Sequence, residues 1–86
     1  MNPQEAYELV DDFEKSEGWL YVREVMRGEV MQAAFSLADE SITEPETINF
    51  RRGALWAAQR LLELPTRLKT NLETELIMKK AQEETQ

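Results

Sequence analysis

The chain of 86 residues contains no cysteine and no histidine. These absences exclude a disulfide framework, a thiol nucleophile and any metal site built from cysteine or histidine. They also leave no imidazole, the side chain whose ordinary pKa suits general acid–base work near neutral pH. We therefore predict a protein that is not an enzyme and that needs no cofactor or metal.

Glycine is scarce as well, with three residues in the whole chain. They are scattered, so no glycine-rich phosphate-binding loop exists, and no serine lies in a Gly-x-Ser-x-Gly elbow. Glu8, Asp11 and Asp12 fall within one helical turn, where carboxylates can hold Mg²⁺ or Ca²⁺ if further oxygens join them. We interpret these three acids as a solvated polar face.

Long apolar runs are missing: none approaches the 18 residues of a membrane-spanning helix, and no charged-then-apolar leader follows Met1. We expect no membrane partner and a cytoplasmic or particle-bound protein. Hydrophobic residues make up 42% of the chain, which favours a folded protein over a disordered one. The length predicts a single helical domain over residues 1–86.

Acids outnumber bases by 17 to 10, for a net charge of −7, and they are unevenly placed. Residues 1–50 carry 12 acids and 3 bases, whereas residues 51–86 carry 5 acids and 7 bases. An acidic front half argues against nucleic acid as a partner, because affinity for DNA rests on Lys and Arg. It allows the two halves of neighbouring copies to attract each other.

A helical period runs through the chain. Asn2-Pro3-Gln4-Glu5 is typical of a helix start, in which Asn2 caps the helix and Glu5 reaches back to the cap. We predict a short N-terminal helix within residues 1–16. Its end leaves two alternatives: Gly18 terminates it in the left-handed conformation, or Ser16 caps the next helix. Its apolar face comprises Ala6, Leu9, Val10 and Phe13.

A second helix is predicted from about Gly18 to Ala38, followed by a polar loop over residues 39–47. The segment Thr43–Glu46 fits a capping box, so a third helix starts at Glu44, or at Ile48 if Thr47 is the cap. A short loop between two long helices favours an antiparallel helical hairpin over residues 18–64.

Two glycines lie inside these predicted helices, at Gly28 and Gly53. Glycine in a helix interior costs close to 1 kcal/mol against alanine, which suggests a packing need. Counting from the loop places Gly28 near Ala57 and Ala58. We therefore expect a close approach of the two helix backbones there.

Leu64-Pro65 interrupts the pattern, so either a kink or a new helix start belongs there. We predict a proline-kinked C-terminal helix over residues 65–86, with fraying from Ala81 onward. Its apolar residues form a narrow leucine seam, which is typical of packing on one partner helix, from the same chain or another copy. The seam consists of Leu64, Leu68, Leu72 and Leu76. The fold class is thus all-α: a hairpin flanked by a short N-terminal helix and this kinked helix.

Arg51 and Arg52 form the one adjacent arginine pair, suited to a carboxylate or phosphate of a partner, or to salt links with acids near the loop. Trp19, Phe50 and Trp56 serve either the core or an interface, where tryptophan is enriched. We take as candidate interface residues these three aromatic residues and the leucine seam, with the arginine pair as a charged contact.

The stretches Phe50-Arg51-Arg52-Gly53-Ala54-Leu55 and Leu61-Leu62-Glu63-Leu64-Pro65, after a helix opened by Trp19, resemble small helical proteins of tailed bacteriophages. The resemblance covers roughly residues 18–68. It implies a non-enzymatic phage accessory or virion-assembly protein, located in the host cytoplasm or the virion, and it carries no catalytic residues. The acidic first helix and the leucine seam lie outside that pattern.

We therefore expect a protein–protein interaction module that self-associates as a homo-oligomer or binds a larger virion protein. The alternative function is an acidic phage-encoded inhibitor whose front half occupies a basic groove of a host defence or nucleic-acid enzyme.

Overall fold

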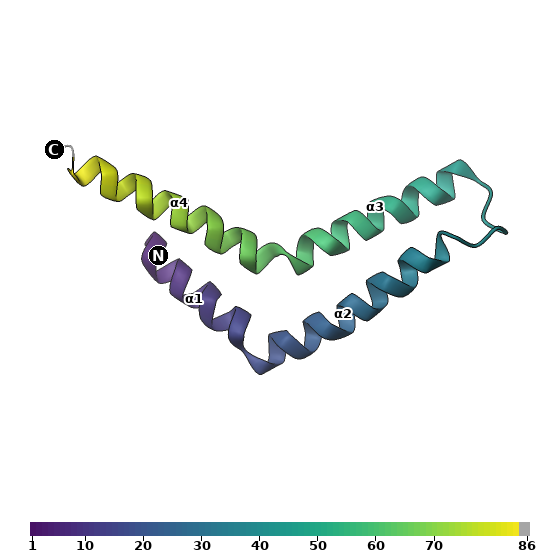
Figure 1. Ribbon diagram of the computed structural model, residues 1–86, viewed down its shortest axis with the longest axis horizontal. Coiled ribbons are helices and arrows are strands. Elements are labelled where there is room, and N and C mark those ends of the chain that lie inside the picture. The colour runs from purple at the N-terminus through teal and green to yellow at the C-terminus, as the bar shows by residue number, and fades with distance from the viewer. Residues whose placement is uncertain (85–86) are drawn as a thin grey trace. The chain divides into compact units, whose positions relative to one another are not determined.

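The computed structural model describes residues 1–84 and is all-α, as predicted, with no strand among these residues (Figure 1). Its four helices are α1 (Pro3–Lys15), α2 (Glu17–Ser36), α3 (Pro45–Leu62) and α4 (Leu64–Glu84). The chain divides into two compact units. The terminal unit comprises Met1–Leu20 and the chain from Leu64 onward, and the central unit comprises Tyr21–Glu63.

The start of α1 follows the predicted cap. The Asn2 side chain accepts a hydrogen bond from the backbone N–H of Glu5 at 2.8 Å, and Pro3 occupies the first turn. Glu5 does not reach the cap backbone. Its carboxylate accepts instead from the Asn2 side-chain amide at 3.0 Å.

Ser16 resolves the alternatives left open between α1 and α2. Its Oγ accepts a hydrogen bond from the Trp19 backbone N–H at 3.2 Å and donates one to the Phe13 carbonyl at 2.7 Å. Gly18 has no positive φ and lies inside α2. One hydroxyl therefore closes the end of α1 and caps the start of α2.

The loop covers residues 37–44, so it begins two residues before the predicted start at 39 and ends three residues before the predicted end at 47. After Ser36 the backbone tightens into i→i−3 bonds, from Leu37 to Ala34 and from Ala38 to Phe35, which ends the α-helix before Ala38. The predicted capping box of Thr43–Glu46 is wrong. Glu44 is the N-cap of α3, and its side chain makes no capping hydrogen bond.

The expected close approach at the glycines is also wrong. A Cβ on either Gly28 or Gly53 would have no heavy atom of a neighbouring element within 4 Å. The alanines of α2 and α3 therefore do not draw the two backbones together at these positions. Both glycines lie within regular helices that alanine would also accommodate.

Leu64-Pro65 marks the start of a separate helix, since α3 ends at Leu62 and α4 begins at Leu64 with Pro65 in its first turn. Of the kink and the new start that the sequence allows, the structure has the new start, so the predicted kink is wrong. Proline suits a first turn because its missing N–H has no helical acceptor there. The helix continues through Glu84, past Ala81, where fraying is predicted. The last two residues, 85–86, lie outside the described residues.

The terminal unit is built by α1 and α4, which pack against each other in antiparallel register. Tyr7 is paired with Glu73, Asp11 with Lys69 and Glu14 with Thr66. Pro65 is the one buried residue among residues 1–84. Apolar side chains line a cavity of about 200 Å³ beside it: Leu9, Val10, Phe13, Leu64 and Leu68.

The central unit consists of most of α2, the loop and α3. The chain leaves α2, turns through the loop and returns along α3 (Figure 1). Within Tyr21–Glu63, all of which the structure describes, no residue is buried. The helices of this unit therefore enclose no core of their own.

Candidate protein-interaction surfaces

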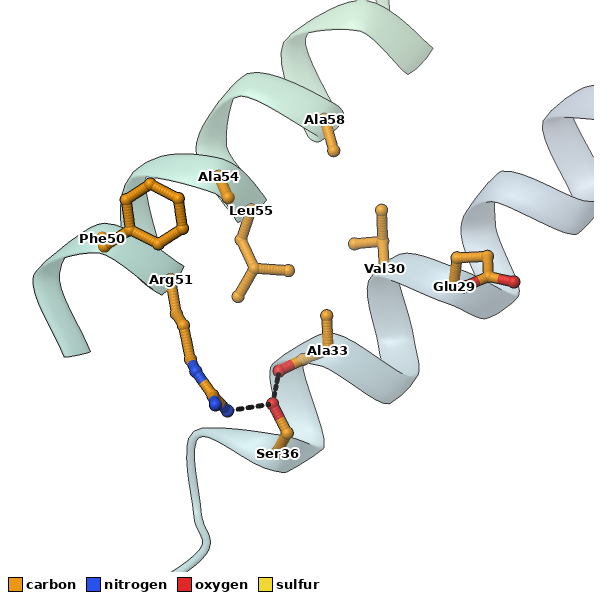
Figure 2. Close-up of a pocket in the computed structure, with 9 residues that line it drawn as sticks. All are labelled: Glu29, Val30, Ala33, Ser36, Phe50, Arg51, Ala54, Leu55 and Ala58. Atoms are coloured by element: carbon orange, nitrogen blue, oxygen red, sulfur yellow. Dashed lines mark hydrogen bonds between the residues drawn. The ribbon is translucent and has the colours of Figure 1, made fainter. Parts of the chain in front are cut away.

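The central unit carries an open groove of about 430 Å³ between α2 and α3, here called the central groove (Figure 2). Its middle is apolar because the helical period puts small and branched side chains of both helices on one face. These are Val30 and Ala33 from α2, and Ala54, Leu55 and Ala58 from α3. Of these five residues, the sequence predicts packing at Ala58 alone. The small size of the three alanines is the one sequence feature that favours an open space here.

Polar residues mark the ends of the central groove. Near the loop, Arg51 donates a hydrogen bond to Ser36 Oγ at 3.3 Å, and Ser36 in turn donates to the Ala33 carbonyl at 2.6 Å (Figure 2). Glu29 lies at the other end (Figure 2). The groove thus carries an acid at one end and a base at the other.

Arg51 also acts on the loop. The backbone N–H and the hydroxyl of Ser41 both donate to Asp39 and, with a smaller contribution from Arg51, lower the pKa of the Asp39 carboxyl. Arg51 therefore bonds within its own unit to a hydroxyl, and not to one of the acids that the predicted salt link requires. Arg52, its neighbour, is exposed.

A second groove, of about 400 Å³, is also formed by α2 and α3. It shares Val30 with the first, but polar groups occupy much of its rim, including Arg27, Gln59 and Glu63. The central groove is therefore the more apolar of the two.

The three aromatic interface candidates lie in different surroundings. Phe50 is 78% exposed and Trp56 is 65% exposed, with the guanidinium of Arg60 lying 5.6 Å from the Trp56 ring. Trp19 is half-buried, and its ring lies 5.1 Å from that of Phe13 in the terminal unit. Phe50 and Trp56 thus present large apolar surfaces to solvent, whereas Trp19 packs within its own chain.

The leucine seam runs along α4 within the terminal unit. Leu64 and Leu68 line the cavity together with residues of α1. The helix that these two leucines face therefore belongs to the same chain. Leu72 and Leu76 are half-buried. Part of the seam is therefore satisfied inside the chain, and Leu68 still leaves 39% of its surface exposed.

Lys69 has a role that the sequence pattern does not predict. Its ammonium lies 2.9 Å from Glu14 and 3.0 Å from Asp11, and these two carboxylates raise the pKa of Lys69 well above its usual value. Lys15 and Lys69 lower the pKa of Asp11, and Lys69 and Thr66 lower that of Glu14. Two sequence features are compatible with this contact: Lys69 follows Leu68 of the leucine seam, and Asp11 and Glu14 lie three residues apart on α1.

Within residues 1–84, no group of three acids is arranged to hold a metal ion. Asp11, one of the three acids of the predicted polar face, is half-buried and bonds to Lys15 and Lys69. In the same part of the chain, no helix is both long and apolar enough to cross a membrane.

Comparisons with known proteins identify no relative of this chain. No protein-family model, no curated protein and no solved structure matches it.

Proposed function

We propose that this protein is a non-enzymatic interaction module that self-associates, and that it serves as a phage structural or assembly component. The observation that carries the proposal is the absence of a buried apolar core: among residues 1–84, only Pro65 is buried. A folded chain with apolar faces in water gains little hydrophobic free energy against its ordering entropy. Association supplies the missing burial.

The exposed area supports the same conclusion. The chain exposes 6969 Å². A compact monomer of this length exposes about 5,200 Å² by the usual area scaling. The excess of about 1,700 Å² exceeds the ~800 Å² that each partner buries in a standard interface. The excess is thus large enough to supply an interface of standard size.

In this proposal α2 and α3 form an antiparallel hairpin that presents the interaction surface. The exposed rings of Phe50 and Trp56 supply apolar area, and Arg51 and Arg52 supply the charged contact. Trp19 and the four leucines of the seam contribute the apolar surface that remains exposed after they pack in the terminal unit. The partner is a second copy or a larger virion protein, in the host cytoplasm or the virion, as the phage resemblance implies.

One observation favours the inhibitor as a second candidate. The acids of α2, the loop and the start of α3 lie on the surface, so the negative front half faces solvent. Such a surface can stand in for phosphates in a basic groove. Its binding would weaken steeply with salt, whereas an apolar oligomer would change little.

The absolute mass in solution, measured by light scattering over a hundredfold concentration range at low and high salt, tests the proposal. We expect a closed oligomer whose mass barely responds to salt. A double variant, Phe50→Ser with Trp56→Ser, should shift the mass toward the monomer. The matched control is Met78→Ser, which removes exposed apolar area from the far end of α4. A monomer at every concentration would overturn self-association.

A further inference from the structure

The central unit needs an external cover. None of Tyr21–Glu63 is buried, and the half-buried Val30 and Leu55 face an open groove. Two helices joined by a loop bury too little apolar area by themselves to offset the cost of ordering them. Something must therefore occupy the central groove if α2 and α3 are to be stable.

A second copy of the same unit fits the requirement in area and architecture. Two helical pairs stacked face to face make a four-helix arrangement around one apolar interior, which is a recurrent stable solution. The whole chain exposes about 1,700 Å² more than a compact monomer of its length, which is more than the ~800 Å² that each partner buries in a standard interface.

The lining of the central groove suits a symmetric contact. Glu29 and Ser36 are seven residues apart on α2, about 10 Å by the helical rise, and Ala33 lies between them. A two-fold axis passing near Ala33 places the alanine side chains of one copy opposite those of the other, so the helices of the two copies can approach closely. Phe50, exposed at the loop end, is a large side chain available to fill the open volume of a facing groove.

The charges at the ends of the central groove are complementary under the same symmetry. Glu29 and Arg51 lie at opposite ends (Figure 2). In a two-fold interface, residue i of one copy meets residue j of the other, and the reverse contact forms as well. An antiparallel alignment therefore brings Glu29 toward Arg51 of a second copy twice. Arg51 uses one N–H for Ser36 and has further donors for this contact.

We propose that the central groove is the dimer interface of this protein, occupied by the same groove of a second copy, with Glu29 facing Arg51 across a two-fold axis. The inference rests on the proposed self-association and names its surface, its occupant and its symmetry.

Charge reversal tests the pairing. Glu29→Arg and Arg51→Glu each place like charges opposite one another at both ends, and each alone should weaken self-association about tenfold or more. Mixed together, the two variants form a heterodimer in which both contacts are again opposite in charge. We expect the mixture to recover a mass and affinity close to those of the wild type, measured by light scattering and sedimentation.

Two control variants carry the same charge changes on α2 outside the central groove. Glu24→Arg lies on an exposed position, and Arg27→Glu lies on the rim of the second groove. Both should leave the affinity unchanged, and circular dichroism checks that every variant keeps its helices. An effect of Arg27→Glu equal to that of Arg51→Glu would move the interface to the second groove and overturn this inference.

The remaining outcomes separate the inference from the function on which it rests. If the wild type self-associates but neither reversal weakens it, the central groove is not the interface, while self-association stands. If each reversal gives a monomer and the mixture stays monomeric, the two-fold pairing is wrong. If the wild type is a monomer throughout, self-association itself fails.

Discussion

Lys69 of α4 lies 2.9 Å from Glu14 Oε1 of α1, across a sequence separation of more than fifty residues. The same ammonium lies 3.0 Å from Asp11 and 5.9 Å from the centre of the Tyr7 ring. One cation thus contacts two turns of α1 from a single position on α4. Because the α1–α4 pair has little buried apolar area, we expect this polar contact to contribute a large part of the stability of the terminal unit.

Replacing Lys69 with methionine keeps most of the aliphatic stem and removes the charge. We expect a melting temperature lower by several degrees, because Asp11 and Glu14 lose their shared partner and repel each other. Thermal unfolding followed by circular dichroism measures the change. Lys80→Met, an exposed change of equal charge on α4, is the control and should have little effect. Equal melting temperatures for both variants would show that the Lys69 contacts do not stabilise the unit.

Stability should fall in acid because of Asp11 and Glu14. The pKa of each is lowered in the folded chain, by Lys15 and Lys69 at Asp11 and by Lys69 and Thr66 at Glu14. The folded state therefore binds fewer protons than the unfolded state, and the contribution is complete above the unfolded pKa of about 4. It is lost as the pH falls through the folded pKa values. Urea unfolding between neutral and acid pH measures this slope, and the double variant Asp11→Asn with Glu14→Gln should flatten it.

Removing the Ser16 hydroxyl should destabilise the α1–α2 junction. Ser16→Ala deletes the acceptor of the Trp19 N–H and the donor to the Phe13 carbonyl. Loss of such a cap costs about 1 kcal/mol. Ser16→Asp keeps an acceptor for the N–H and should retain more of the stability than alanine does. Chemical unfolding compares the three proteins, and equal stability of all three would contradict the capping role.

Alanine at Gly28 or Gly53 should stabilise the protein. Neither new Cβ meets a neighbouring element within 4 Å, and each helix gains from a stronger helix former, by about 0.5–1 kcal/mol per site. Denaturant titration of the two single variants measures the gain. Gly18→Ala, in the first turn of α2 and equally open, provides a third comparison. A loss of stability at Gly28 or Gly53 would mean that another helix approaches there more closely than the structure shows.

The aromatic and leucine residues proposed for the interface show which properties of a side chain can be predicted from the sequence. Periodicity places Phe50, Trp56 and Leu68 on helices but does not say whether water, the same chain or another chain covers each one. The structure leaves Phe50 and Trp56 mostly exposed and sets Leu68 beside α1. Exposure depends on which elements meet, and that is decided by contacts between residues far apart in sequence.

The sequence by itself determined the all-α class, the Asn2 cap and the breaks near Ser16, the loop and Pro65, because each depends on hydrogen bonds and backbone limits within a few residues. It also placed Gly28 near the alanines of α3, but the distance between two helices is not a local property. Only the tertiary structure decided that α4 packs on α1, that Lys69 meets Asp11 and Glu14, and that α2 and α3 leave an open groove. A narrow leucine seam and a patch of alanines are compatible with several partners, and the choice among them follows from packing and charge across the whole chain.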